Sequence, residues 1–253
     1  MRIFENILET MEDDGFCVYK NVVDAATAQR WTEAMMKVGH AHAHSRLMWD
    51  IRRHENVQRV FADIWKVQPS DLLCSFDGGT HRASGEDAFT LPWHVDQDAS
   101  HGPGCINVQG VLALQRVDKQ SGGTAFARGS HKSHAKWVTH VCDEWEFVEI
   151  DDQLILPDSV IQPVLEPGDM VIWDSRCAHR VSPPVDPNSQ RTIAYLSYVP
   201  RTWVNDAVKS QRSTAFAKGI ATTHWITRFV DRGAHRELPP WRQVPDSIST
   251  LIR

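Results

Sequence analysis

The segment LPWHVDQDAS, residues 91–100, alternates apolar and polar residues in the way that is typical of a half-buried β-strand. Side chains two residues apart on a strand point to the same face, so His94 and Asp96 are predicted to meet beside that strand. An imidazole and a carboxylate placed in this way are suited to hold a metal ion. A His-x-Asp triplet also occurs by chance on exposed strands and loops, so the pair indicates a site only if further ligands exist.

Short β-rich segments continue on both sides of this strand, from residue 71 to residue 200. They are separated by Gly, Pro and Asp residues of the kind found in turns. The segments are DLLCSFD (71–77), AFTLPWHVD (88–96), CINVQGVLAL (105–114), GTAFARGS (123–130), SVIQPVLEP (159–167), DMVIWDS (169–175) and RTIAYLSYV (191–199). Many short strands with this punctuation are typical of a sandwich or a jelly roll, so the core over residues 71–200 is predicted to be mainly β.

The residues before this core, 1–70, are predicted to be a mostly helical lead-in. Apolar residues at helical spacing, or helix-forming composition, mark three segments at 3–11, 25–38 and 55–67, and a short β-rich run, GFCVYKNVV, lies at 15–23. Asp24 stands where it can cap the second helix.

The residues after the core, 201–253, are predicted to form a helical and irregular tail. A helical pattern covers 205–220, and a Pro- and Arg-rich stretch with weak periodicity follows it. We expect this tail to pack on the sheet, so that residues 1–253 form a single domain with helices at both ends.

Composition excludes several classes of function. The chain is 42% hydrophobic and 23% charged with a net charge of -5, so it lacks the basic excess of a nucleic-acid-binding protein. No apolar run approaches the roughly 18 residues that span a bilayer, and the start of the chain lacks a secretory signal pattern, so a cytoplasmic protein is expected. The composition leaves the oligomeric state open.

The five cysteines are odd in number and include no Cys-x-x-Cys pair. Neither a disulfide framework nor a thiolate zinc site is indicated, and reduced packing residues are expected. The cysteines are Cys17, Cys74, Cys105, Cys142 and Cys177.

A second run of histidines, His40, His42 and His44, competes with His94 as a metal site. It follows a helix-forming segment and lacks β-branched neighbours, so a strand is not favoured there, and on a helix the three side chains would fan around the axis. A solvated linker is the favoured interpretation, although such a run can bind stray metal.

The segment LEPGDMVIWDSRCAHRVSPP, residues 165–184, supplies a third candidate ligand. It contains a Pro-Gly-Asp turn, an apolar strand and then His179 before a proline-rich turn. Two histidines and one carboxylate form the facial triad of non-haem Fe(II) oxygenases, which leaves coordination positions open. Arg191 begins the strand that follows, and its planar fork of donors suits the far carboxylate of a bidentate co-substrate.

Four motifs resemble those of the phytanoyl-CoA dioxygenase-like family of Fe(II)/2-oxoglutarate oxygenases. They are WHVDQD (93–98), SGGTAFARGSHKSH (121–134), GDMVIWDSRCAHR (168–180) and RTIAYLSYVPR (191–201). With GFCVYKNVV, the resemblance covers most of residues 1–201, and TTHW (222–225) is weakly similar to some members.

This resemblance implies a double-stranded β-helix (jelly roll) with N-terminal and C-terminal helices packed on it. It implies Fe(II) on His94, Asp96 and His179, with 2-oxoglutarate chelating the iron and Arg191 holding its far carboxylate. It also implies a reaction with O2 that releases succinate and CO2 and oxidises a C-H bond of a small-molecule substrate, by hydroxylation or by desaturation or ring closure.

Three further residues have two interpretations each. Asp98 shares the strand face with Asp96 and is an alternative ligand, although the family pattern favours Asp96. Gln109 and Ser182 occupy places where family members contact 2-oxoglutarate, yet each suits an ordinary strand or turn. The segment GGTHRASGEDAF (78–89) is predicted as a mobile lid or as a plain surface loop.

Three other functions compete with a hydroxylase. A halogenase needs a small residue in place of Asp96, so it is disfavoured. A cupin-like metalloenzyme that does not use 2-oxoglutarate would leave Arg191 without a role, and a noncatalytic jelly-roll binding module would not need the complete triad. The motifs do not identify the substrate, because it is recognised by loops and by the tail.

Overall fold

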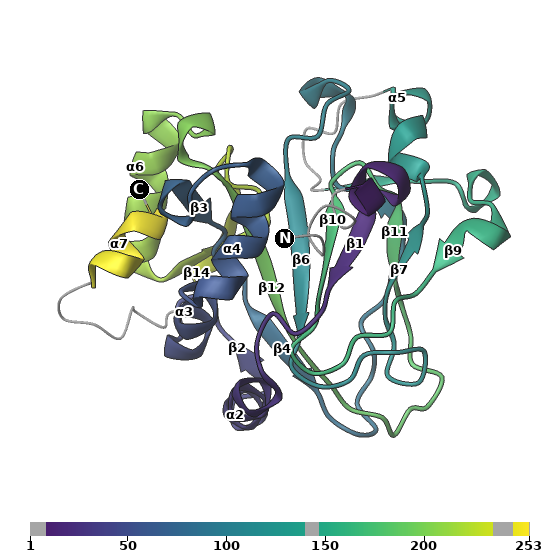
Figure 1. Cartoon of the computed structure of the whole chain (residues 1–253), viewed down its shortest axis with the longest axis horizontal. Coiled ribbons are helices and arrows are strands. Elements are labelled where there is room, and N and C mark those ends of the chain that lie inside the picture. The colour runs from purple at the N-terminus through teal and green to yellow at the C-terminus, as the bar shows by residue number, and fades with distance from the viewer. Residues whose placement is uncertain (1–8, 140–146, 235–244, 253) are drawn as a thin grey trace.

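Two antiparallel sheets face each other at the centre of the protein (Figure 1). The computed structural model describes residues 9–139, 147–234 and 245–252. The large sheet has the order β1-β10-β6-β12-β4-β2, with β3 also on β12, and the small sheet has the order β8-β5-β11-β7-β9. This arrangement confirms the predicted jelly roll.

The strands of the large sheet are β1 (Phe16–Tyr19), β2 (His40–Ala41), β3 (Leu72–Cys74), β4 (Gly79–Arg82), β6 (Val108–Ala113), β10 (Met170–Asp174) and β12 (Arg191–Pro200). Those of the small sheet are β5 (Leu91–Val95), β7 (Gly123–Ala127), β8 (Val148–Glu149), β9 (Val160–Ile161) and β11 (His179–Ser182). A separate hairpin pairs β13 (Ile220–Thr222) with β14 (Asp231–Ala234).

The α-helices are α2 (Ala25–Met36), α3 (Arg46–Arg52), α4 (Glu55–Trp65), α5 (His134–Trp137), α6 (Asp206–Lys218) and α7 (Asp246–Ile252). Of these, α2, α3, α4, α6 and α7 lie on the side of the large sheet that faces away from the small sheet (Figure 1). The helical residues 9–14, just before β1, lie instead near α5 and contact His131 and Lys132. Among the described residues, we find no helix with the length and apolar character that crossing a membrane requires.

Two hydrophobic cores result from the alternation of side chains along the strands. On β12, Ile193 and Tyr195 point toward the small sheet, whereas Leu196 and Tyr198 pack under the helices. The inner core also stacks Phe16 on Phe126, with ring centroids 4.5 Å apart. The sheet is therefore buried on both faces.

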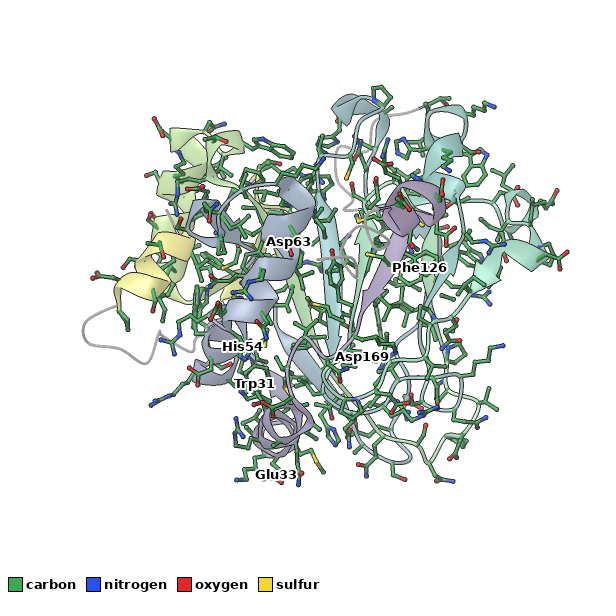
Figure 2. All side chains as sticks on the ribbon, in the orientation of Figure 1. Trp31, Glu33, His54, Asp63, Phe126 and Asp169 are labelled. Atoms are coloured by element: carbon green, nitrogen blue, oxygen red, sulfur yellow. The ribbon has the colours of Figure 1, made fainter. Side chains whose placement is uncertain are left out.

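A local signal explains where α2 begins, and a ring contact joins α2 to the start of α4. The side chain of Asp24 accepts a hydrogen bond from the backbone N–H of Thr27, which confirms the predicted cap. His54 precedes α4, and its ring meets that of Trp31 on α2 edge-on, with centroids 5.7 Å apart (Figure 2). The two helices are thus joined at the surface of the large sheet.

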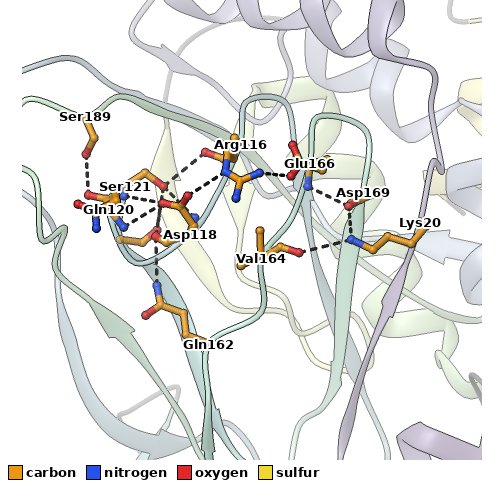
Figure 3. A network of polar contacts seen from close by, with 11 residues as sticks. Lys20, Arg116, Asp118, Gln120, Ser121, Gln162, Val164, Glu166, Asp169 and Ser189 are labelled. Carbon is orange, nitrogen blue, oxygen red and sulfur yellow. Dashed lines mark hydrogen bonds and ion pairs between the residues drawn. The ribbon is translucent and has the colours of Figure 1, made fainter.

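A polar network ties the loops at one end of the jelly roll (Figure 3). The carboxylate of Asp169 accepts hydrogen bonds from Lys20 Nζ at 2.7 Å and from the backbone N–H of Glu166 at 2.9 Å. Gly168 precedes it with φ +96°, and a Cβ there would lie 2.2 Å from the carbonyl oxygen of Val23. The turn between β9 and β10 therefore requires glycine.

Several sequence-based expectations are corrected. His40–Ala41 is a strand, β2, which pairs with β4, although the histidine run was not expected to be extended. Residues Gly79–Arg82 of the predicted lid form β4 and pair with β12, so that part of the prediction is wrong. By contrast, the predicted β-rich run over 15–23 is confirmed as β1, which lies at the edge of the large sheet.

The remaining expectations divide into three groups. The predicted helices over 25–38, 55–67 and 205–220 are confirmed as α2, α4 and α6. α3, α7, β8 and β11 were not predicted. The predicted helix at 3–11 lies largely outside the described residues, as does Cys142, and the other four cysteines are free thiols.

Candidate metal centre

His94 and His179 face each other across two strands of the small sheet. They are directly paired in the antiparallel register of β5 and β11, and their ring centroids are 4.2 Å apart. The carboxylate of Asp96 completes the group, with Oδ2 3.4 Å from His179 Nε2 and Oδ1 3.9 Å from His94 Nε2. One donor atom from each residue lies within 4.8 Å of the others, so the three can share one metal ion.

A β-bulge lies next to this pair of histidines. His179 pairs with His94 but Val181 pairs with Leu91, so three residue steps on β5 (94 − 91 = 3) match two on β11 (181 − 179 = 2). Bulges of this kind re-aim side chains and are common beside active sites. Directly after β5, the backbone N–H of Asp96 donates to the carbonyl oxygen of Ser175 at 3.0 Å, which fixes the position of the carboxylate.

Backbone hydrogen bonds select the tautomer of both histidines. Nδ1 of His94 lies 2.8 Å from the carbonyl oxygen of Pro92, and Nδ1 of His179 lies 2.9 Å from that of Cys177. A carbonyl oxygen only accepts, so Nδ1 carries the proton and Nε2 keeps its lone pair for the centre of the site.

Burial and charge set the protonation of these groups. Burial alone would raise the pKa of Asp96, but His179, His224 and His94 and a hydrogen bond from Gln109 together lower it. Burial, assisted by His94, lowers the pKa of His179 to about 4. A carboxylate that stays ionised beside a neutral imidazole is the state in which a metal ion binds.

A cavity of about 400 Å³ opens beside the three residues. Its walls include the apolar side chains of Leu91, Phe147, Trp173 and Val181. Gln109 also lines it, and its Nε2 donates to Oδ2 of Asp96. The arrangement is concave and mostly apolar with a few convergent polar groups, as in small-molecule sites.

Arg191 stands opposite Arg82 on neighbouring strands, and each residue is 6% exposed. Nε of Arg191 and Nη1 of Arg82 are buried and have no hydrogen-bond partner within the described parts of the chain. Burial lowers the pKa of Arg191, and the charge of Arg82 adds to this effect. Two buried guanidinium groups with unpartnered nitrogens are chemically suited to pair with an anion.

The arginines connect to the metal cavity. Both line a second cavity of about 680 Å³, and Tyr195 lines this outer cavity as well as the metal cavity. Thr124 lines the metal cavity and also a small enclosed space beside Arg191. A molecule that reaches from the triad to Arg191 would therefore pass Thr124 or Tyr195.

A model of the phytanoyl-CoA dioxygenase (PhyH) family matches residues 11–185, more than half of the 253 residues. The chain belongs to the phytanoyl-CoA dioxygenase family. The matched range includes the three candidate metal ligands and ends before Arg191.

Individual relatives agree with this assignment. The Ava biosynthesis cluster protein O of Aspergillus versicolor is 27% identical over 212 residues, which is 74% of this chain and 67% of that protein. The structure of the protein of GlcNAc Inducible Gene 2 from Candida albicans has a TM-score of 0.73 at 15% identity, covering 98% of this chain and 78% of that one. The epimerase SnoN, in complex with Fe3+, alpha ketoglutarate and nogalamycin RO, has a TM-score of 0.62 at 14% identity, covering 79% and 84%. The two structures show a shared fold.

Two further predicted residues of this phytanoyl-CoA dioxygenase family member lie away from the three-residue cluster. Asp98 caps a short 3-10 helix, where its Oδ1 accepts from Ser100 N–H at 3.0 Å and contacts His101 Nδ1 at 2.8 Å. Ser182 and Arg180 line a separate pocket that contains no residue of the triad, whereas Val181 lines both that pocket and the metal cavity. The structure therefore does not bring Ser182 to the triad.

The histidine run of this family member does not form a common site. His44 is 1% exposed, and its Nε2 contacts the carbonyl oxygen of Ile220 at 2.8 Å. His40 and His42 line the outer cavity instead. Of the described residues, the set that can hold a metal is His94, Asp96 and His179.

Sequence reasoning missed three residues that the fold brings to this site. Thr124 and Arg82 lie on β7 and β4, where nothing in the local pattern distinguishes them from other strand residues. His224 lines the metal cavity from the tail, and burial lowers its pKa to about 4. Its only signal was the weak similarity of TTHW to the family.

Proposed function

We propose that this protein is an Fe(II)- and 2-oxoglutarate-dependent dioxygenase that hydroxylates, or otherwise oxidises a C-H bond of, a small-molecule metabolite. The cluster of His94, Asp96 and His179 on facing strands carries the proposal. When bound there, Fe(II) with 2-oxoglutarate supplies O2-dependent oxidation of a C-H bond, coupled to release of succinate and CO2.

The residues present fit both groups. Three donors come from one side and leave other coordination positions free for a chelating co-substrate. We assign the far carboxylate of 2-oxoglutarate to Arg191, because its buried Nε has no other partner among the residues that the structure describes. Arg82 adds a second positive charge at the same end of the cavity. Gln109 orients Asp96 through its hydrogen bond.

The surroundings of the triad favour hydroxylation or a related C-H oxidation over other uses of the same fold. Asp96 occupies the place that a halogenase leaves to halide, so halogenation is disfavoured. A cupin-like enzyme without 2-oxoglutarate, or a noncatalytic binding module, would bury the guanidinium of Arg191 without a partner.

Epimerisation is the second candidate reaction. It is favoured by one observation, the similarity in fold to the epimerase SnoN. The metal cavity of about 400 Å³ and the outer cavity of about 680 Å³, which share Tyr195 in their walls, are in the size range of sites for metabolites, and both reactions are compatible with such a substrate. The product distinguishes them, because hydroxylation adds an oxygen atom to the substrate and epimerisation leaves its mass unchanged.

The proposed function is tested in two stages. Under anaerobic conditions, Fe(II) and 2-oxoglutarate together are expected to produce the charge-transfer absorption band of the chelate in the wild-type protein and not in His179→Ala. Under air, a panel of metabolites is then screened for succinate release from labelled 2-oxoglutarate and for product mass. A wild-type protein that forms no chelate with Fe(II) and 2-oxoglutarate would contradict the proposal.

A further inference from the structure

A third histidine, His224, reaches the metal cavity from the loop between β13 and β14. This loop lies outside the residues 11–185 that match the family. The side chain is 13% exposed, and its Nε2 lies 4.0 Å from Oδ1 of Asp96. His224 is thus near the donor set but belongs to a different part of the chain.

His224 is not a member of the metal-binding set. The donor atoms that lie within 4.8 Å of one another come from His94, Asp96 and His179 alone among the described residues. At 4.0 Å, Nε2 of His224 is also too far from Oδ1 of Asp96 for a hydrogen bond. Its polar atom therefore has no role in holding the three ligands in place.

The Nε2 atom of His224 is buried and has no hydrogen-bond partner within the described residues. Buried polar atoms in folded proteins are nearly always satisfied, so each exception needs an explanation. The other residues that line the cavity include the apolar side chains of Leu91, Phe147 and Trp173. A ligand in the cavity is the partner that this atom lacks.

The backbone around His224 is held firmly. Its carbonyl oxygen accepts from Asn107 Nδ2 at 3.3 Å, and Oδ1 of Asn107 in turn accepts from Ser197 Oγ at 2.9 Å. The next residue, Trp225, is 1% exposed and stacks on His101 with centroids 4.9 Å apart. A residue whose backbone is held in this way presents its side chain to the cavity from a fixed position.

We propose that His224 donates a hydrogen bond from Nε2 to the small exogenous ligand that coordinates the metal beside Asp96, and that this ligand is oxygen. The distance from Nε2 to a ligand atom of Asp96 places the imidazole near the first coordination sphere rather than near the remote parts of a substrate. The inference rests on the proposed function, since it needs Fe(II) at the triad.

Nitric oxide is a suitable probe, because it binds Fe(II) in place of oxygen and gives an electron paramagnetic resonance signal. The experiment uses the full chain with Fe(II) and 2-oxoglutarate under anaerobic conditions. It compares the wild type, His224→Leu, His224→Gln and the matched control His54→Leu, whose imidazole lies at the contact of α2 and α4.

His224→Leu is expected to bind Fe(II) and 2-oxoglutarate within about twofold of the wild type, because no ligand is lost. Its Kd for nitric oxide should rise about fivefold, the effect of one neutral hydrogen bond, and the rhombicity of the nitrosyl signal should change. His224→Gln keeps an amide donor, so its values should lie between those of the wild type and of His224→Leu. His54→Leu should match the wild type.

Two results would overturn the inference. One is an unchanged nitric oxide affinity and signal in both His224 variants. The other is a loss of Fe(II) binding in folded His224→Gln, which would make His224 a metal ligand. If instead the wild type binds neither Fe(II) nor 2-oxoglutarate, the proposed function fails. Circular dichroism shows whether each His224 variant is folded. If one of them is not, the other tests the inference.

Discussion

His94 and His179 are directly opposed residues of β5 and β11, so the antiparallel pairing of two strands places two metal donors side by side. Replacement of either by alanine leaves two donors and is expected to remove most Fe(II) binding. Metal titration of His94→Ala and His179→Ala measures this loss, with His54→Ala as a control of the same kind. Fe(II) affinity equal to that of the wild type in both variants would rule out the centre.

The second prediction concerns the buried arginine pair. Arg191→Lys replaces a planar fork by a point charge, so the Kd of 2-oxoglutarate should rise roughly tenfold. Arg82→Met should have a smaller effect in the same direction, because Arg82 also donates to Ser189 Oγ. Titration of the charge-transfer band with 2-oxoglutarate measures the Kd in both variants. The control is Arg59→Lys, because Arg59 is exposed on the surface. Unchanged affinity in Arg191→Lys would favour a metalloenzyme that does not use 2-oxoglutarate.

The two carboxylates of WHVDQD should behave differently. Asp96→Asn replaces a charged ligand by a weak neutral one and is expected to abolish succinate formation. Asp98 contacts Ser100 and His101, so Asp98→Asn should retain measurable activity, with a loss of roughly 10- to 100-fold at most. Activity in Asp96→Asn together with its absence in Asp98→Asn would reverse the assignment.

The fourth prediction concerns acid stability and His44. Burial lowers the pKa of this side chain from 6.5 to about 4. Below pH 6.5 the His44 side chain therefore takes up a proton in the unfolded chain but not in the folded chain. Its contribution to the free energy of unfolding is fully present above pH 6.5 and is lost as the pH falls toward 4. Between pH 6.5 and pH 5, the contribution of His44 to the free energy of unfolding should fall by about 2 kcal/mol.

Urea unfolding of the metal-free protein at pH 7.5 and pH 5 tests this loss. His44→Gln keeps a donor for the carbonyl oxygen of Ile220 but does not titrate, so its free energy of unfolding should fall less between the two pH values. Other buried histidines contribute equally to both proteins. An equal decrease in the free energy of unfolding of the wild type and of His44→Gln would show that His44 has an ordinary pKa in the folded protein.

The fifth prediction concerns the contact of α4 with the large sheet. A Cβ at Gly110 would lie 2.5 Å from Ile172 Cδ1 and 3.2 Å from Phe61 Cζ. Gly110→Ala is therefore expected to lower the free energy of unfolding by about 1–3 kcal/mol through overpacking. Gly104→Ala, with no atom within 4 Å of the added carbon, is the matched control. Equal melting temperatures for both variants would contradict this account of the packing.

The sequence predicted the elements whose own residues carry a strong pattern. β6, β10 and β12 are rich in apolar and β-branched residues, and α2 carries its own capping residue, Asp24. By contrast, β4 has the sequence GTHR, which lacks any apolar alternation. It is a strand because β12 and β2 pair with it on either side, and such tertiary pairing has no local signal.

The same distinction applies to the site. His94 and Asp96 are two residues apart, so strand geometry alone predicts that they meet. His179 was a candidate because it follows an apolar strand and precedes a proline-rich turn, and the family resemblance supported that assignment. Arg82 and His224 reach the cavities through the pairing of distant strands and the packing of Trp225 on His101. Contacts between residues more than a hundred positions apart leave no periodicity to detect.

Arg232 lines the metal cavity from β14, and its place in the chain has an evolutionary consequence. The donors and most of the cavity wall lie within the range that matches the family, whereas Arg232 lies after it. Drift in the tail thus alters what enters the cavity while the donor set stays intact. Grouping members of the family by their tails, rather than by their motifs, should sort them by the molecules on which they act.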